Sequence, residues 1–209
     1  MITKICGIKS KSTLLCCEKN KVDFFGMIFF EDSPRNIKLQ EAKELQELSK
    51  NMNIDGVGVF VNKNINDLEE IVKDLDLKFT QLHGEENNEY IIKLKKLKID
   101  VIKKISIKNK YDLENTKKYP DADYILFDYK PEKNELPGGN AKSFNWNIIN
   151  NFELNKPWFM SGGINLDNID LITKYINPFG VDLSSGVEKE LGIKDNQIIN
   201  NFIEKLNHA

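Results

Sequence analysis

The chain has 209 residues, which is enough for one domain with a full hydrophobic core. Its 30 basic and 32 acidic residues give a formal net charge of -2, so it has no electrostatic footprint for nucleic acid, and no apolar run could span a bilayer. The three cysteines show neither zinc-site spacing nor a disulfide framework. Because no charged and then apolar leader precedes the first strand, we expect a cytoplasmic protein without membrane or nucleic-acid partners.

In chain order, short apolar runs alternate with segments of helical periodicity. The first run, Ile2–Cys6, ends at Gly7 and predicts a strand with apolar side chains inward and polar ones outward. The predicted strands are Ile2–Cys6, Val22–Phe29, Ile54–Val61, Phe79–Leu82, Asp100–Ile105, Tyr124–Asp128, Trp158–Met160 and Val181–Leu183. The predicted helices are Ser10–Asn20, Leu39–Asn51, Ile65–Leu75, Asn88–Leu97, Tyr111–Tyr119, Phe144–Asn151, Leu166–Tyr175 with Asn165 as its N-cap, and Asn196–Leu206.

Eight strands that alternate with eight helices predict a parallel sheet, and neither a linker nor a change in composition divides the chain. We therefore expect residues 1–209 to form a single (β/α)8 TIM barrel. The competing architecture is an open doubly wound sheet. It would place a Gly-x-Gly-x-x-Gly fingerprint after the first strand, and Lys4-Ile-Cys-Gly7 does not match it.

Two turns near the end of the chain have the composition of a phosphate site. Gly162 and Gly163 follow the seventh strand in a tight turn, and Ser184, Ser185 and Gly186 open a short helical turn after the eighth. Such turns aim unpaired backbone N–H groups and a helix N-terminus at one point, where a phosphate is stabilised. In a (β/α)8 barrel the loops after strands seven and eight form this site.

Two chemically useful side chains lie at the ends of other strands, where the chemistry of this fold is located. Cys6 ends strand one and could act as a base or nucleophile, although a free thiol has a pKa of roughly 8.5 and needs a favourable setting. Asp128 ends strand six and could act as an acid, so the pair suits proton transfer on a carbon skeleton. The alternatives are a small apolar core residue for Cys6, and a helix cap or an ion pair with Lys130 for Asp128.

Arg35 is the only arginine of the chain, and its planar fork suits a carboxylate or a phosphate. The alternative is a salt bridge with Glu31 or Asp32.

His83 follows strand four and is either a donor that faces a ligand or a structural side chain. We expect no metal there, because no second His, Asp or Glu is placed to assist it. Gly138–Gly139 predicts either a lid over the substrate or an ordinary turn after the preceding proline.

Eight motifs in the same order resemble phosphoribosylanthranilate isomerases, enzymes of tryptophan biosynthesis, over nearly the whole chain. The motifs are Lys4-Ile-Cys-Gly7, Gly26-Met-Ile-Phe29 with Ser33-Pro-Arg35, Gly58-Val-Phe-Val-Asn62, Gln81-Leu-His-Gly84, Leu126-Phe-Asp128, Gly138-Gly139 with Phe144-Asn-Trp146, Ser161-Gly-Gly-Ile164, and Gly180-Val-Asp-Leu-Ser-Ser-Gly-Val-Glu188.

The resemblance implies an Amadori rearrangement of N-(5-phosphoribosyl)anthranilate without a cofactor. It assigns Asp128 as general acid at the ring oxygen and Cys6 as general base at C2′. It places Arg35 near the anthranilate carboxylate. The residues Gly162, Gly163, Ser184, Ser185 and Gly186 would hold the phosphate, and His83 is included among the substrate-binding residues. We expect a phosphorylated small molecule as substrate, and a monomer or homodimer.

Three departures from the family pattern leave the acid and the base untouched: Lys9, Gly138-Gly-Asn-Ala141 and Glu190-Leu-Gly192. They bear on the lid behaviour of the sixth loop and on the entry to the last helix.

A related phosphate-binding lyase would need a lysine and a glutamate in the mouth, which no strand end supplies. A non-catalytic sugar-phosphate binder would have no reason to combine Cys6, Asp128 and Arg35. An isomerase that also accepts the histidine-pathway substrate would carry aspartates on strands one and six.

Overall fold

The structure is a computed structural model that describes residues 1–132, 134–136, 138–149 and 152–208. Eight parallel strands follow one another in chain order and close into a barrel, because β1 pairs with both β2 and β8. The predicted (β/α)8 barrel is thereby confirmed. The strands are β1 (Ile2–Cys6), β2 (Phe24–Ile28), β3 (Asp55–Phe60), β4 (Phe79–Leu82), β5 (Asp100–Ile107), β6 (Tyr124–Tyr129), β7 (Trp158–Met160) and β8 (Gly180–Leu183).

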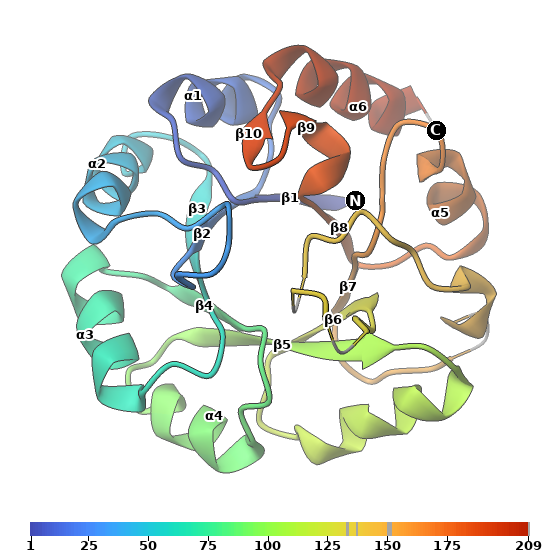
Figure 1. The fold of residues 1–209 in the computed structure, drawn as a ribbon, viewed down its shortest axis with the longest axis horizontal. Coiled ribbons are helices and arrows are strands. Elements are labelled where there is room, and N and C mark those ends of the chain that lie inside the picture. Colours follow the sequence, from blue (N-terminus) through green and yellow to red (C-terminus); the bar gives the residue numbers. More distant parts are fainter. Residues whose placement is uncertain (133, 137, 150–151, 209) are drawn as a thin grey trace.

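Helices form a ring outside the barrel, and the yellow loop that follows β6 lies over its centre (Figure 1). In α3, for example, Asn64 caps the first turn, and Leu68, Val72 and Leu75 recur at helical spacing on the buried face. None of the helices in the described ranges is long and apolar enough to cross a membrane. The α-helices are α1 (Lys11–Lys19), α2 (Leu39–Ser49), α3 (Ile65–Leu75), α4 (Asn88–Lys95), α5 (Ile169–Tyr175) and α6 (Asn196–His208).

The predicted fifth helix, Tyr111–Tyr119, is a 3₁₀ helix, η1 (Lys110–Lys118). Its first turn is held by Asp112, whose carboxylate accepts the Asn109 N–H at 2.9 Å. Further along, the Thr116 hydroxyl donates to the carbonyl three residues back at 2.8 Å. Local side-chain bonds of this kind compete with regular α-helical pairing, and the tighter helix results.

The predicted helix Phe144–Asn151 is also short, because the structure forms only the 3₁₀ helix η2 (Trp146–Ile149) there. The last part of that prediction, residues 150–151, lies outside the described residues, as does Pro137 of the predicted loop turn.

The predicted helix Leu166–Tyr175 begins three residues late, at Ile169 of α5. The Asn168 side chain accepts the Asn165 N–H at 2.9 Å and donates to the Gly163 carbonyl at 2.8 Å. These bonds hold the segment in turns, so Asn165 does not cap the helix as predicted.

The orientation predicted for β1 was wrong, because Lys4 points into the barrel and is fully buried. Side chains alternate along a strand, so Ile2, Lys4 and Cys6 share the inner face. Ile5 lies on the opposite face, in the larger apolar cluster that includes residues of the surrounding helices. The apolar part of the barrel interior is a second cluster of Cys6, Val57, Val59, Ile102, Leu126 and Phe159.

A small antiparallel hairpin that the sequence did not predict follows β8. It consists of β9 (Glu188–Glu190) and β10 (Ile193–Lys194), and a short 3₁₀ helix, η3 (Ser185–Val187), leads into it. The hairpin lies between α1 and α6 at the barrel rim (Figure 1). It therefore brings Glu188 and Lys194 to the ends of the barrel strands.

Candidate active site

The C-terminal ends of the strands surround one central cavity. Because all strands are parallel, their ends meet at one mouth, as expected for this fold. Five residues selected from the sequence line this central cavity: Cys6, Arg35, His83, Asp128 and Ser184. Gly138 and Gly139, from the loop after β6, also line it.

Cys6 ends β1 with its side chain among buried groups, 5% exposed. It pairs in register with Gly26 of β2, where an added Cβ would lie 2.8 Å from the Cys6 Sγ. Burial raises the pKa of the Cys6 thiol, against the opposing effect of Lys4 and Lys194. The thiol form therefore predominates near neutral pH, and the two lysines are the groups that favour the thiolate.

A buried ion pair lies next to Cys6. Lys4 Nζ donates to Asp182 Oδ1 at 2.9 Å, and both side chains are at most 5% exposed. Burial acts to lower the pKa of Lys4, but Asp182 and Cys6 outweigh it and raise the pKa. Sequence analysis missed this pair, because Lys4 was expected to face outward and Asp182 was not considered apart from its motif.

Asp128 is the penultimate residue of β6 and contacts His83, which directly follows β4. Its Oδ1 accepts the Tyr129 N–H at 2.8 Å, and its Oδ2 lies 3.3 Å from His83 Nε2. On its other side, His83 Nδ1 lies 2.8 Å from Gln81 Nε2. Burial lowers the pKa of His83, so we assign a neutral ring in which Nδ1 accepts from Gln81 and Nε2–H donates to Asp128.

Arg35 is buried and makes a bidentate ion pair that the sequence did not predict. Its Nε and Nη2 donate to the two carboxylate oxygens of Glu188 at 2.7 and 2.8 Å. Nη2 also lies 3.3 Å from the Gly139 carbonyl, which ties the loop after β6 to the arginine. Lys194 donates to Glu188 at 2.7 Å as well. Neither of the predicted alternatives, Glu31 or Asp32, is the partner.

A second hollow adjoins the central cavity at the loops after β7 and β8. Gly162, Gly163 and Ser185 line it, and the two glycines have φ values of +87° and +70°, which favour glycine. Among the described residues, the N–H groups of these three residues donate to no protein acceptor. Gly186 is not part of the lining, because it packs against the Ile164 carbonyl, where an added Cβ would lie 1.9 Å away.

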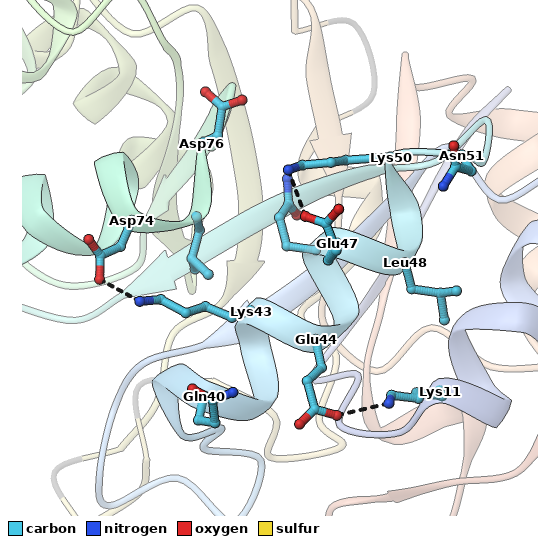
Figure 2. A pocket seen from close by; sticks show the side chains of 12 residues that line it. Lys11, Gln40, Lys43, Glu44, Glu47, Leu48, Lys50, Asn51, Asp74 and Asp76 are labelled. Carbon is cyan, nitrogen blue, oxygen red and sulfur yellow. Dashed lines mark hydrogen bonds and ion pairs between the residues drawn. The ribbon is translucent and has the colours of Figure 1, made fainter.

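A wider groove lies on the outer surface, between α2 and its neighbours α1 and α3 (Figure 2). Most of its charged side chains are paired, for example Lys11–Glu44 at 2.9 Å and Lys43–Asp74 at 2.8 Å. The groove contains none of the strand-end residues, so we interpret it as a solvated face with surface ion pairs.

The family of the chain follows from sequence comparison. The sequence model of N-(5'phosphoribosyl)anthranilate (PRA) isomerase matches residues 3–205. The chain belongs to the PRA isomerase family. This confirms the resemblance found in the motifs, and membership identifies the chain as an isomerase of tryptophan biosynthesis.

Individual PRA isomerases support the assignment over nearly their full length. The chain is 39% identical over 203 residues to the enzyme of Thermoanaerobacter sp. (strain X514), covering 97% of this chain and 96% of the relative. The crystal structure of the Thermotoga maritima enzyme is 31% identical and superposes with a TM-score of 0.88, with complete coverage of both chains. A PRA isomerase solved with reduced 1-(o-carboxyphenylamino)-1-deoxyribulose 5-phosphate is 30% identical, with a TM-score of 0.84 and complete coverage.

Proposed function

We propose that the chain catalyses the Amadori rearrangement of N-(5-phosphoribosyl)anthranilate, with Asp128 as general acid and Cys6 as general base. The observation that carries this proposal is that β1 and β6 present a thiol and a carboxyl group to one cavity. An acid and a base on two sides of a bound sugar are what an aldose-to-ketose rearrangement requires.

In the first step, Asp128 gives its proton to the ring oxygen of the ribose. The bond between C1′ and this oxygen breaks, and the lone pair of the anthranilate nitrogen forms an iminium group at C1′. His83 Nε2, which lies 3.3 Å from Asp128 Oδ2, donates its hydrogen to the carboxylate that results and stabilises it.

In the second step, the Cys6 thiolate removes the proton from C2′, which the neighbouring iminium group has made acidic. The electrons of that C–H bond form the enolamine, which then becomes the ketone as C1′ takes up a proton and the C2′ hydroxyl group loses one. Lys4 and Lys194 favour the thiolate electrostatically, against burial. The positive iminium group adds to their effect at the moment when the thiolate is needed.

The phosphate is assigned to the hollow beside β7 and β8. The N–H groups of Gly162, Gly163 and Ser185, which meet no acceptor in the described ranges, suit an anion, and the two glycines have no side chain that would block its approach. The hydroxyl of Ser184 donates to the Cys6 carbonyl at 3.1 Å, which links the phosphate side to the base. The remaining predicted ligand, Gly186, supports this loop through its packing on Ile164.

The test is a fluorescence assay in which phosphoribosylanthranilate is generated in place from anthranilate and phosphoribosyl pyrophosphate by a coupled transferase. The wild-type chain is expected to remove the fluorescence of the substrate. Cys6→Ser and Asp128→Asn should each lower turnover by roughly 10²–10⁴-fold. Cys16→Ser is the matched control, because Cys16 lies on α1 outside the cavity and should retain full turnover. Normal turnover in Cys6→Ser or in Asp128→Asn would contradict the proposed mechanism.

A further inference from the structure

Lys194 of β10 is a buried lysine that makes more contacts than an ion pair requires. Its side chain is 2% exposed, and its Nζ donates to Glu188 at 2.7 Å. The same Nζ donates to the carbonyl oxygen of Ser184 at 2.9 Å and to the hydroxyl oxygen of that residue at 3.2 Å. Both carboxylate oxygens of Glu188 already accept from Arg35. The charge of Glu188 is therefore matched without Lys194, and the bonds to Ser184 are the feature that needs an explanation.

The peptide group between Ser184 and Ser185 connects Lys194 with the hollow beside β7 and β8. The described part of the chain contains no cis peptide bond, so the C=O and N–H of this group point in opposite directions. Lys194 holds the Ser184 carbonyl, and the Ser185 N–H therefore points away from the ammonium group. Ser184 and Ser185 line the hollow, whereas Lys194 is not among the described residues that do so. The N–H side of the peptide group is thus the side that a phosphate can reach.

The other bonds of Ser184 restrain this peptide group less closely. The Val187 N–H, one turn further along η3, lies 3.4 Å from the Ser184 carbonyl, which is long for a hydrogen bond. The Ser184 hydroxyl donates to the Cys6 carbonyl, so that bond fixes the side chain and not the carbonyl. The bond from Lys194 is therefore the main restraint on the direction of the Ser184 carbonyl.

The hairpin that follows β8 holds Lys194 itself in place. Glu188 and Lys194 pair across the hairpin, and the Asp195 N–H closes its base by donating to the Val187 carbonyl at 2.9 Å. At the turn, the Gly192 N–H donates to Glu188 Oε2 at 3.1 Å. The ammonium group therefore lies in a cradle whose acceptors are fixed by other bonds, as a rigid support requires.

We propose that Lys194 is a positioning residue that orients the peptide group between Ser184 and Ser185 so that the Ser185 N–H meets the phosphate of the substrate. This inference rests on the proposed function, because that function places the phosphate beside β7 and β8. It also gives the hairpin a task, which is to carry a donor to the far side of the phosphate loop. Gly162 and Gly163 belong to a different turn, so their N–H groups do not depend on Lys194.

NMR titration with inorganic phosphate tests the inference, because an amide proton shifts downfield when it donates to an anion. In the wild type, the amide signals of Gly162, Gly163 and Ser185 should all shift. In Lys194→Met, phosphate should bind roughly 10-fold more weakly, as expected for the loss of one hydrogen bond to an anion. At saturation the Ser185 signal should no longer shift, whereas the signals of the two glycines should shift as in the wild type.

Lys189→Met is the matched control, because Lys189 is exposed on β9 of the same hairpin and its loss removes the same charge. Its affinity and its three shifts should equal those of the wild type. If Lys194→Met binds phosphate more weakly but keeps all three shifts at saturation, Lys194 acts through its charge alone and the inference is overturned. Unchanged affinity in Lys194→Met overturns it as well.

The wild type supplies a test that does not depend on the folding of Lys194→Met. If phosphate shifts the signals of Gly162 and Gly163 but not that of Ser185, the inference is overturned. A titration that shifts none of the three signals overturns it together with the phosphate assignment. If all three signals shift in the wild type and only Ser185 fails to shift in Lys194→Met, the inference stands, even where the fluorescence assay shows no turnover and the proposed reaction fails.

Discussion

The two ends of the barrel interior are built from the same strands but from opposite kinds of side chain. At the N-terminal end, aromatic rings fill the space, with ring centroids 4.9 Å apart for Phe24 and Phe79 and 5.9 Å apart for Tyr124 and Phe159. At the C-terminal end lie the charged side chains of the mouth. His83 follows Phe79 by four positions, and Asp128 follows Tyr124 by four, so the alternation of side chains places both members of each pair on the inner side of the barrel.

The difference shows where the molecule tolerates buried charge. An aromatic filling needs no partners and stabilises by burial and edge contacts. A buried charge needs a partner, and the C-terminal end supplies one for Lys4, Asp128 and Arg35. We infer that the aromatic end stabilises the barrel and that the charged end, whose intact ion pairs add little net stability, performs the reaction.

The largest expected effect comes from making the charged end resemble the apolar one. Lys4→Met leaves Asp182 as an unpaired buried charge, and we expect a loss of about 3–5 kcal/mol in the free energy of unfolding. The double variant Lys4→Met/Asp182→Leu should recover most of this stability but not the turnover. Urea unfolding and the fluorescence assay measure the two quantities. A single variant as stable as the wild type would contradict the role given to the pair.

A smaller effect is expected at the contact between β1 and β2. Gly26→Ala places a methyl group 2.8 Å from the Cys6 Sγ and 3.0 Å from its Cα, so the backbone or the thiol must move. Overpacking of this kind lowers stability by about 1–3 kcal/mol. Since the displaced atom is the proposed base, kcat should fall as well. Unchanged kcat in a destabilised variant would show that the position of the thiol is not critical.

The smallest of these effects belongs to the aromatic end. Phe159 is 1% exposed and lies at 6.2 Å from Phe24 and 5.7 Å from Phe179, measured between ring centroids. Phe159→Leu should lower the unfolding free energy by about 1–2 kcal/mol through loss of packing. Steady-state assays should give the kcat and KM of the wild type. A large fall in kcat would mean that the two ends are not separable.

Much of this contrast could be predicted from the sequence. Alternating strands and helices predicted the barrel, and parallel strand ends meet at one mouth, so Cys6 and Asp128 were expected in the same cavity. The partners of the charges could not be predicted. Glu188 is 153 residues from Arg35, on a hairpin that no periodicity indicated, and Asp182 is 178 residues from Lys4. Such pairs depend on register and barrel closure, which local sequence patterns do not contain.

The sequence also did not show which of the two adjacent lysines of β5 faces the mouth, for a physical reason. The run Val101-Ile-Lys-Lys-Ile105 has two adjacent lysines, and only the alternation of an actual strand separates them. Lys103 lies on the outer face and binds Glu86, whereas Lys104 lies in the mouth.

The central claim is that Cys6 removes the C2′ proton, and the pH dependence of kcat/KM tests it most directly. Because burial raises the pKa of the Cys6 thiol and the base must be deprotonated, kcat/KM of the wild type should still increase with pH above neutrality. In Cys6→Asp the base is a carboxyl group, with an unperturbed pKa of about 3.9, so this acidic limb should move down by several pH units. Lys4, Asp182 and Lys194 surround the position in both proteins. An acidic limb at the same pH in both would contradict the account, because the titrating base would then be a group other than Cys6.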